Sequence, residues 1–354
     1  MTIIFAILLF SFLIFIHELG HFVAAKASGV RVNEFALFMG PAIFKKQVGE
    51  TLYSLRTIPI GGSCAMEGED CETDDPRCFQ KASWWKRFII LAAGSFMNLV
   101  TGVLLFAIVF APVKEFVVPV ISSVEEGCTV VRDGGLQIGD EFIELDGEKI
   151  YVQADFSALL QFNPGDTHDI VVLRDGKKIV FEDYLMEKHV FVDAETGEES
   201  ERYGFSFSIQ EANFSNKLKL VWNSSINVVR NVRLSLQMML TGRAGLGDMT
   251  GVVGLVGIMN DSAQAAPSVL DAILNMLYIG GFIAINLAVM NLLPIPALDG
   301  GRVVGLLLTT AIEAITHKKL DAKYEGYIHG VGMILLFGLM ALILFKDIFT
   351  IFKG

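Results

Sequence analysis

The sequence predicts a polytopic α-helical membrane protein with four transmembrane helices and an inserted, extracytosolic, β-rich domain. Of its 354 residues, 53% are hydrophobic, and the mean hydropathy of +0.52 exceeds that of a typical soluble globular protein. Four apolar runs are long enough to form spans, whereas residues 114–212 contain no such run and carry most of the surplus acid behind the net charge of -11. The acidic balance also excludes the basic patch expected of a nucleic-acid-binding protein.

The first predicted span begins at Ile3 and is continuously apolar to Ile16. With the stretch His17–His21 it approaches the roughly 20 residues that cross a bilayer. A cleaved signal peptide is the alternative, because Ala25-Lys26-Ala27 imitates a small-residue cleavage site. No positive charge precedes the apolar run, however, and ionisable residues interrupt it. The pattern therefore favours a retained span.

Three further spans are predicted from the same criterion. Trp84 and Trp85 beside Lys86 and Arg87 are typical of an interfacial anchor at the start of the second span. The three runs are Phe88–Val113, Val269–Leu293 and Tyr327–Phe345.

Cations cluster in two of the loops between these spans, and the positive-inside rule places such loops in the cytosol. Both termini and the segment from 114 to about 260 are then outside. The predicted organisation is 1–113 (two spans and a cytosolic loop), 114–212 (the outer domain) and 213–354 (an amphipathic helix, a Gly-rich loop and two spans). The cations are Lys26, Arg31, Lys45, Lys46, Arg56, Arg77, Lys81, Lys86 and Arg87 in the first loop, and Arg302, Lys318, Lys319 and Lys323 in the other.

Residues 114–212 read as short strands joined by Asp-Gly turns, of which the turn at 175–176 is a strong hairpin signal. The sequence from Leu136 to Asp140, followed by Ile143 to Gly147, resembles a PDZ domain of the bacterial protease type; an unrelated small β-barrel is the alternative. The expected strands are Val117–Val124, Glu141–Leu145, Ile170–Leu173 and Lys178–Phe181, with a short helix at Phe156–Leu160.

From Asn216 to Met239 the chain is amphipathic and carries interspersed cations. We expect this segment to lie on a membrane surface with Leu218, Leu220, Val221 and Trp222 turned towards the membrane, although a fifth span is an alternative. Residues Gly242–Gly257 are rich in glycine and predict an irregular loop.

The motif His17-Glu18-Leu19-Gly20-His21 carries the clearest chemical signal. On a helix, His17 and His21 share one face and can bind one zinc ion, while Glu18 can act on a water at the metal's open position as a general base. Ionisable residues at the end of an apolar span are costly unless they are paired or liganded, so a functional site is the default interpretation. The alternative is a helix end whose histidines face water.

A catalytic zinc site needs a third protein ligand, and Asp299 is the best candidate. It follows the third span after Pro294 and Pro296, which break the helix, and precedes Gly300. An unwound segment at membrane depth is tolerated where it lines a cavity. Because the first and third spans both run inward, His21 and Asp299 are expected near the cytosolic side.

These motifs together resemble the site-2 protease family of intramembrane metalloproteases, and within it the sigma-factor-regulating bacterial branch of the RseP type. The resemblance covers nearly the whole chain. It implies zinc held by His17, His21 and Asp299, with Glu18 as catalytic base, in a bacterial cytoplasmic (inner) membrane. It also implies single-span substrates, such as anti-sigma factors or signal-peptide remnants, that an upstream site-1-type protease has already shortened outside.

The resemblance extends to two substrate-binding elements. Asn286 and Asn291 match asparagines that contact the unwound substrate, although an amide within the bundle can also join two helices. Thr51–Met66, which contains Gly61 and Gly62, resembles a membrane-dipping β-hairpin whose edge could pair with an extended substrate. The chain departs from the family by having Gly94-Ser95 and Gly251-Val252 where Gly-Pro is usual, and by having one PDZ-like segment only.

Two questions stay open at the level of sequence. Cys64, Cys71 and Cys78 are evenly spaced in the first cytosolic loop, but they form no C-x-x-C pair and cytosolic thiols normally stay reduced. The rival to a protease is a non-catalytic scaffold or chaperone of the same fold, or a metal transporter. A transporter would repeat ionisable residues across several spans, which this chain does not.

Overall fold

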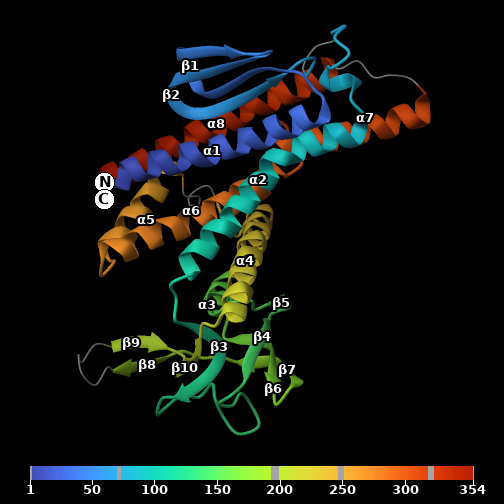
Figure 1. The fold of residues 1–354 in the computed structure, drawn as a ribbon. Coiled ribbons are helices and arrows are strands. Elements are labelled where there is room, and N and C mark those ends of the chain that lie inside the picture. Colours follow the sequence, from blue (N-terminus) through green and yellow to red (C-terminus); the bar gives the residue numbers. More distant parts are fainter. Residues whose placement is uncertain (1, 70–72, 193–198, 246–250, 318–322, 354) are drawn as a thin grey trace. The chain divides into compact units, whose positions relative to one another are not determined.

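The computed structural model describes residues 2–69, 73–192, 199–245, 251–317 and 323–353 (Figure 1). The chain divides into two compact units, one formed by Met1–Val109 with Met239–Gly354 and the other by Phe110–Met238. Cys71 is outside the described residues.

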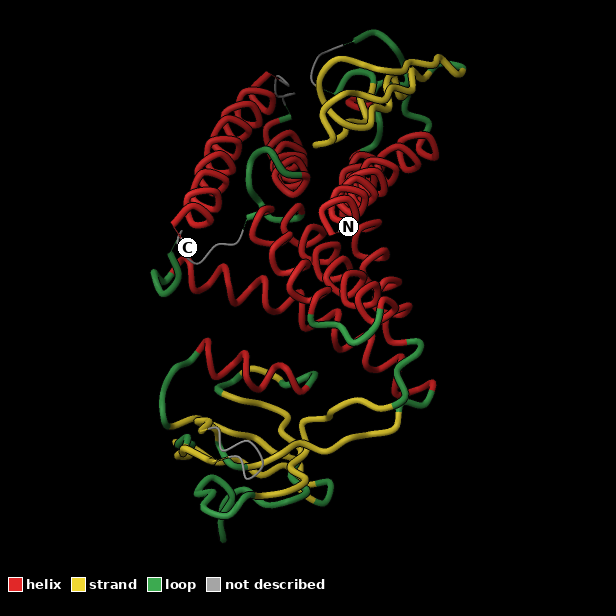
Figure 2. The backbone as a smooth tube through the Cα atoms, turned by 90° about the vertical axis from the view of Figure 1, so that its left-hand side faces the viewer, coloured by secondary structure: helices red, strands yellow, loops and turns green. Residues whose placement is uncertain are grey.

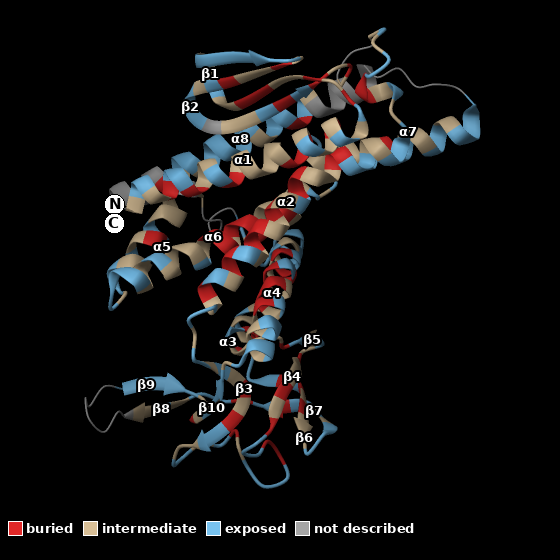
Figure 3. Cartoon of the chain, viewed as in Figure 1, coloured by how far each residue is buried: buried red, intermediate tan, exposed pale blue. Residues whose placement is uncertain are grey.

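The first unit is helical and contains four helices that are long and apolar enough to cross a membrane, as predicted. The last of these helices is largely exposed along its length (Figure 3). Its exposed side chains include the apolar Ile334, Leu335 and Phe345, as lipid contact requires. The spans are α1 (Thr2–Ser28), α2 (Trp84–Phe110), α6 (Val269–Asn291) and the part Gly330–Asp347 of α8 (Lys323–Lys353).

Glycines allow these helices to pack backbone to backbone. A Cβ at Gly20 of α1 would lie 2.4 Å from the carbonyl oxygen of Ala93 in α2. A Cβ at Gly102 of α2 would lie 2.4 Å from Ile285 and 2.9 Å from the Gly281 carbonyl oxygen in α6. Close approach through small residues is typical of helix association in membranes. Helix α2 is therefore held directly against both α1 and α6.

The prediction of an irregular loop over Gly242–Gly257 is wrong from Val252 onward, and its residues 246–250 lie outside the described part of the chain. Residues Val252–Gln264 form helix α5, with Gly251 as its N-cap. Met259 of α5 is fully buried in a cluster that also contains Leu9 and Leu13 of α1 and Ile283 of α6. Burial of this apolar face outweighs the cost of about 1 kcal/mol for each glycine inside the helix.

Helix α6 ends at Asn291, before the prolines, as expected. A turn follows in which Ala297 has a φ of 87°, and a second helix, α7 (Asp299–Thr316), begins at Asp299. A Cβ at Gly300 would lie 2.2 Å from the carbonyl oxygen of Leu292, so only glycine permits this tight return. The sequence did not predict α7.

Strands β1 (Val32–Val48) and β2 (Thr51–Met66) are long, bent and paired with each other (Figure 2). The register places Leu37 opposite Leu55 on one side and opposite Gly62 on the other. The end of β2 from Gly62 to Met66 therefore pairs along one side with the start of β1. No described strand pairs with its other side.

The second unit has a five-stranded path in the order β10-β3-β4-β6-β7, to which β5 adds by pairing with β4. The predicted strands and the short helix are confirmed, with somewhat wider bounds. The elements are β3 (Glu115–Val124), β4 (Glu141–Leu145), β5 (Glu148–Lys149), α3 (Gln153–Phe162), β6 (Thr167–Arg174), β7 (Lys177–Leu185), the separate pair β8 (His189–Val192) and β9 (Glu199–Arg202), β10 (Phe205–Glu211) and α4 (Phe214–Leu240).

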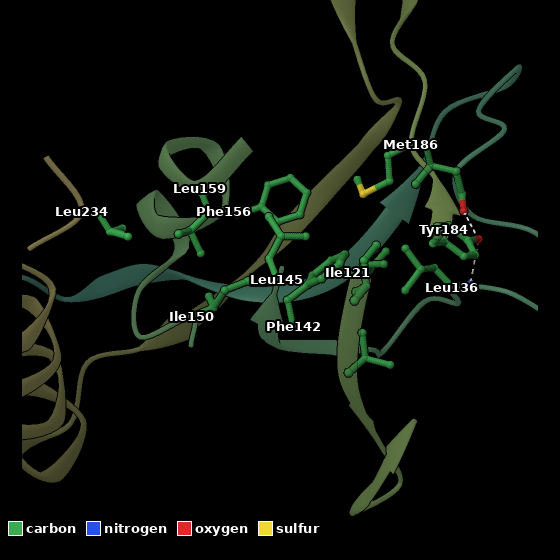
Figure 4. Packing of buried hydrophobic residues seen from close by; sticks show 13 residues of the cluster. Ile121, Leu136, Phe142, Leu145, Ile150, Phe156, Leu159, Tyr184, Met186 and Leu234 are labelled. Carbon is green, nitrogen blue, oxygen red and sulfur yellow. Dashed lines mark hydrogen bonds between the residues drawn. The ribbon is translucent and has the colours of Figure 1, made fainter. Parts of the chain in front are cut away.

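The core of this unit lies between the sheet, α3 and α4 (Figure 4). Phe142 and Phe156 pack with ring centroids 4.9 Å apart, and Leu234 of α4 joins the same cluster. The hydroxyl of Tyr184 donates to the Val130 carbonyl oxygen at 2.6 Å, so the buried phenol is satisfied.

Helix α4 is amphipathic, but its faces are not distributed as predicted. Leu218 and Trp222 are exposed, whereas Val221 is buried and Arg230 forms a buried ion pair of 2.7 Å with Asp155. The prediction that Val221 faces a membrane is therefore wrong, because this side of α4 packs on its own domain. Helix α4 is also absent from the candidate spans among the described residues.

Candidate metal centre

The two histidines of the first motif lie on one face of α1, one turn apart. Their Nε2 atoms are 3.2 Å from each other. Asp299, the first residue of α7, places Oδ2 3.2 Å from Nε2 of His17 and 3.4 Å from Nε2 of His21. The structure thus brings together three potential ligands that are separated by nearly the whole chain.

These separations fit zinc. Zinc bonds of about 2.0–2.1 Å place neighbouring ligands of a tetrahedron about 3.3 Å apart. The three ligand atoms are 3.2, 3.2 and 3.4 Å apart and so occupy three corners of such a tetrahedron. The Nδ1 of His21 lies 2.8 Å from the carbonyl oxygen of Ile90, which fixes the proton on Nδ1 and leaves the Nε2 lone pair for a metal.

Glu18 lies between the two histidines in sequence and is half-buried. Its side chain reaches the bend in β2, where a Cβ built on Gly62 would lie 2.8 Å from Cγ of Glu18. The carboxylate also interacts electrostatically with His21, His17 and Asp299. A carboxylate in this position can move protons between a water at the metal and a substrate held along β2.

Of the other predicted site residues, only Gly62 is shown beside the centre. Gly61 has a φ of 75° and makes the bend that brings Gly62 to Glu18. Asn286 is half-buried in α6 and Asn291 is its last residue. Among the described residues, neither side-chain amide makes a hydrogen bond to another side chain or to the backbone.

Sequence reasoning did not assign site roles to three residues of α2. A Cβ at Gly94 would lie 2.3 Å from Nε2 of His21 and 2.8 Å from Cε1 of His17. Ser95 donates to Oδ2 of Asp299 at 3.4 Å, and the Asn98 amide lies 3.2 Å from Nδ1 of His17. The available signal was the presence of buried polar residues inside an otherwise apolar span.

The hairpin and the loop after it are tied to neighbouring elements by ion pairs. Arg302 of α7 donates to Oε1 of Glu69, and Oε2 of Glu69 accepts from the Met66 amide at the end of β2 at 3.3 Å. At the other end of the hairpin, hydrogen bonds from Lys26 and then Arg77 hold the pKa of Glu50 below its ordinary value. Cys64 and Cys78, two of the evenly spaced cysteines in this part of the chain, are buried and are not in a disulfide.

Two histidines and a glutamate on a candidate membrane span, with an aspartate beside them, are an arrangement typical of a metal-dependent hydrolase in a membrane. The chain matches peptidase family M50 over residues 5–339. It is 36% identical over 349 residues to a provisionally named zinc metalloprotease of Clostridium perfringens, covering 98% of each chain. It is 26% identical over 441 residues to the regulator of sigma-W protease RasP of Bacillus subtilis, covering 99% of each.

The chain therefore belongs to peptidase family M50, the site-2 protease family. It is a zinc-dependent intramembrane metalloprotease and a bacterial membrane protein.

Proposed function

We propose that this protease cleaves single-span membrane proteins near the cytosolic face of the bacterial cytoplasmic membrane, with His17, His21 and Asp299 as the zinc ligands and Glu18 as the general base. The observation that carries the proposal is the tetrahedral spacing of three ligand atoms beside Glu18. Zinc bound there supplies a Lewis acid that activates water and the scissile carbonyl group. Glu18 accepts the proton of the attacking water and passes it to the leaving amine.

The open side of β2 is proposed to hold the substrate. A transmembrane helix hides its peptide bonds, so the scissile segment must be extended before cleavage. Gly62 begins the segment of β2 that has no described partner on one side, and a Cβ built on it would lie 2.8 Å from Cγ of Glu18. A substrate strand added along this edge would place a peptide bond next to the base. Asn286 and Asn291 would bind substrate backbone groups that the lost helix leaves without partners.

The outer domain is proposed to be a PDZ domain that screens substrates outside the membrane. The positive charge of the loops supports a topology in which both termini and this domain are extracytosolic. RasP is named as a regulator of sigma-W, and this supports anti-sigma factors as one substrate class here, with signal-peptide remnants as another. An upstream site-1-type protease would cut first, since a full-length outer part would meet the acidic domain.

The second candidate is a catalytically inactive scaffold of the same fold. The test is zinc content and cleavage of a single-span reporter by the purified full chain, wild type beside Glu18→Gln, His21→Ala and Asp299→Ala. We expect about one zinc per chain in wild type and in Glu18→Gln, with cleavage abolished in Glu18→Gln and zinc lost from the other two variants. Normal cleavage by Glu18→Gln contradicts the mechanism, and zinc-loaded wild type that cleaves no reporter favours the scaffold.

A further inference from the structure

We infer that Asn98 is a positioning residue of the metal centre, which accepts a hydrogen bond from His17 and thereby fixes the ring nitrogen that binds zinc. This inference rests on the proposed zinc site but assigns a role that the ligand set does not contain. Asn98 is fully buried in α2, and its amide group lies 3.2 Å from Nδ1 of His17.

The hydrogen-bonding state of Asn98 carries the inference. With the amide as oriented, Nδ2 faces His17 and the buried Oδ1 has no hydrogen-bond partner. A buried acceptor without a partner costs about 1–3 kcal/mol. The two ends of an amide are assigned from their surroundings, so the reversed orientation fits the same shape.

The chemistry of His17 selects the reversed orientation. If Nδ2 donated to Nδ1 of His17, a neutral ring would carry its proton on Nε2, the atom that faces Asp299 and His21. That tautomer has no lone pair for a metal. If instead Oδ1 accepts from Nδ1–H, the orphaned acceptor is satisfied and Nε2 is free to bind zinc.

Helix α2 thus supports all three ligands from one face. The Ile90 carbonyl oxygen accepts from His21, Gly94 leaves room for both rings, and Asn98 holds His17. These residues are spaced by four, so they line one face of the helix. Ser95, one residue after Gly94, donates to Asp299. Outer partners of this kind change metal affinity by about 10–100-fold when they are lost.

The experiment compares Asn98→Leu with Asn98→Asp in the full-length protein. Leucine matches the shape without any polar atom, whereas aspartate keeps an acceptor and removes the donor. Zinc affinity is measured by competition with a chelator, and the Co²⁺-substituted protein gives an absorption spectrum of the ligand geometry. Thr101→Val is the matched control, because Thr101 lies one turn along α2 and donates to the Met97 carbonyl oxygen away from the site.

We expect zinc binding to weaken about 10–100-fold in Asn98→Leu and to stay within about threefold of wild type in Asn98→Asp and Thr101→Val. If zinc binding is weakened as much in Asn98→Asp as in Asn98→Leu, residue 98 must donate a hydrogen bond, and the inference is overturned. Unchanged binding in Asn98→Leu also overturns it, while the proposed ligand set stands. If Asn98→Leu does not fold, Asn98→Asp decides alone: retained zinc supports the acceptor role and lost zinc refutes it.

Discussion

Gly94 shows how a residue without a side chain controls the metal centre. A Cβ at Gly94 would overlap Nε2 of His21, the atom proposed to bind zinc. A small residue in a membrane helix often serves packing between helices. At Gly94 the space that it leaves is filled by two imidazole rings instead of another backbone.

Gly94→Ala should therefore abolish zinc binding and proteolysis. The added methyl would lie 2.3 Å from Nε2 of His21, and α2 is held too firmly by its neighbours to withdraw. Gly338→Ala is the matched control, since its Cβ meets nothing within 4 Å in the spanning part of α8. The control should keep its zinc and gain up to about 1 kcal/mol of helix stability. The zinc content of both purified variants is measured. Zinc bound to Gly94→Ala at the wild-type level would contradict the prediction.

At the scale of elements, Glu69 links the end of β2 to the start of α7. It accepts from Arg302 with one carboxylate oxygen and from the Met66 amide with the other. Asp299 lies three residues before Arg302 on the same helix. Glu69 thus connects the proposed substrate-binding strand to the helix that carries the third proposed ligand.

Exchanging the charges of this pair tests the link. Glu69→Lys or Arg302→Glu alone places like charges together, and we expect each to lower kcat/KM about tenfold, equivalent to about 1.4 kcal/mol. The double exchange should recover most of the loss while zinc content stays constant. Arg77→Glu, which removes an exposed pair with Glu50, should change kcat/KM less than threefold. Absence of recovery in the double variant would show that the pair does not act as a unit.

The sequence predicted the elements with strong patterns and missed those whose form depends on packing. Four long apolar runs and the helix-breaking prolines identified the spans, and alternating strands with Asp-Gly turns identified the sheet. Helix α5 was missed because two glycines lower its intrinsic propensity, and only its contacts with α1 and α6 restore it. Asn98 received no role because helical spacing relates residues within α2 and does not show that His17 faces them.

At the scale of the molecule, the two units are stabilised in different ways. The second unit buries charge: Asp140 is fully buried and accepts from both Nε and Nη2 of Arg174 at 2.6 and 2.7 Å. The hydrogen bond to Asp140 raises the pKa of Arg174, so its guanidinium stays charged at any physiological pH. The first unit instead relies on glycine-mediated helix contacts and, at its outer surface, on lipid.

Arg174→Met should consequently destabilise the second unit by about 3–5 kcal/mol, because it leaves Asp140 buried without its cation. Arg233→Met is the matched control, since Arg233 pairs with Glu148 in a more exposed position. Its loss should lower the free energy of unfolding by no more than about 1 kcal/mol. Amide hydrogen exchange of β4 and β6 in the full chain measures the loss of stability in both variants. Exchange should accelerate in the first variant only, and equal protection in the two would contradict the assigned role of Asp140.

The proposed topology of the chain rests on the charge of its loops and can be tested directly. Single cysteines replace two exposed charged residues in a chain whose native cysteines are changed to serine: Lys177 at the start of β7 and Asp74 in the loop after the hairpin. A membrane-impermeant maleimide added to intact cells should label Lys177→Cys only, and permeabilised cells should give labelling of both. We expect this outcome because loops rich in cations beside membrane spans are usually retained in the cytosol. Labelling of Asp74→Cys in intact cells would show that the chain has the opposite orientation. The metal centre would then lie near the outer face of the membrane, where the proposed order of two proteases could not apply.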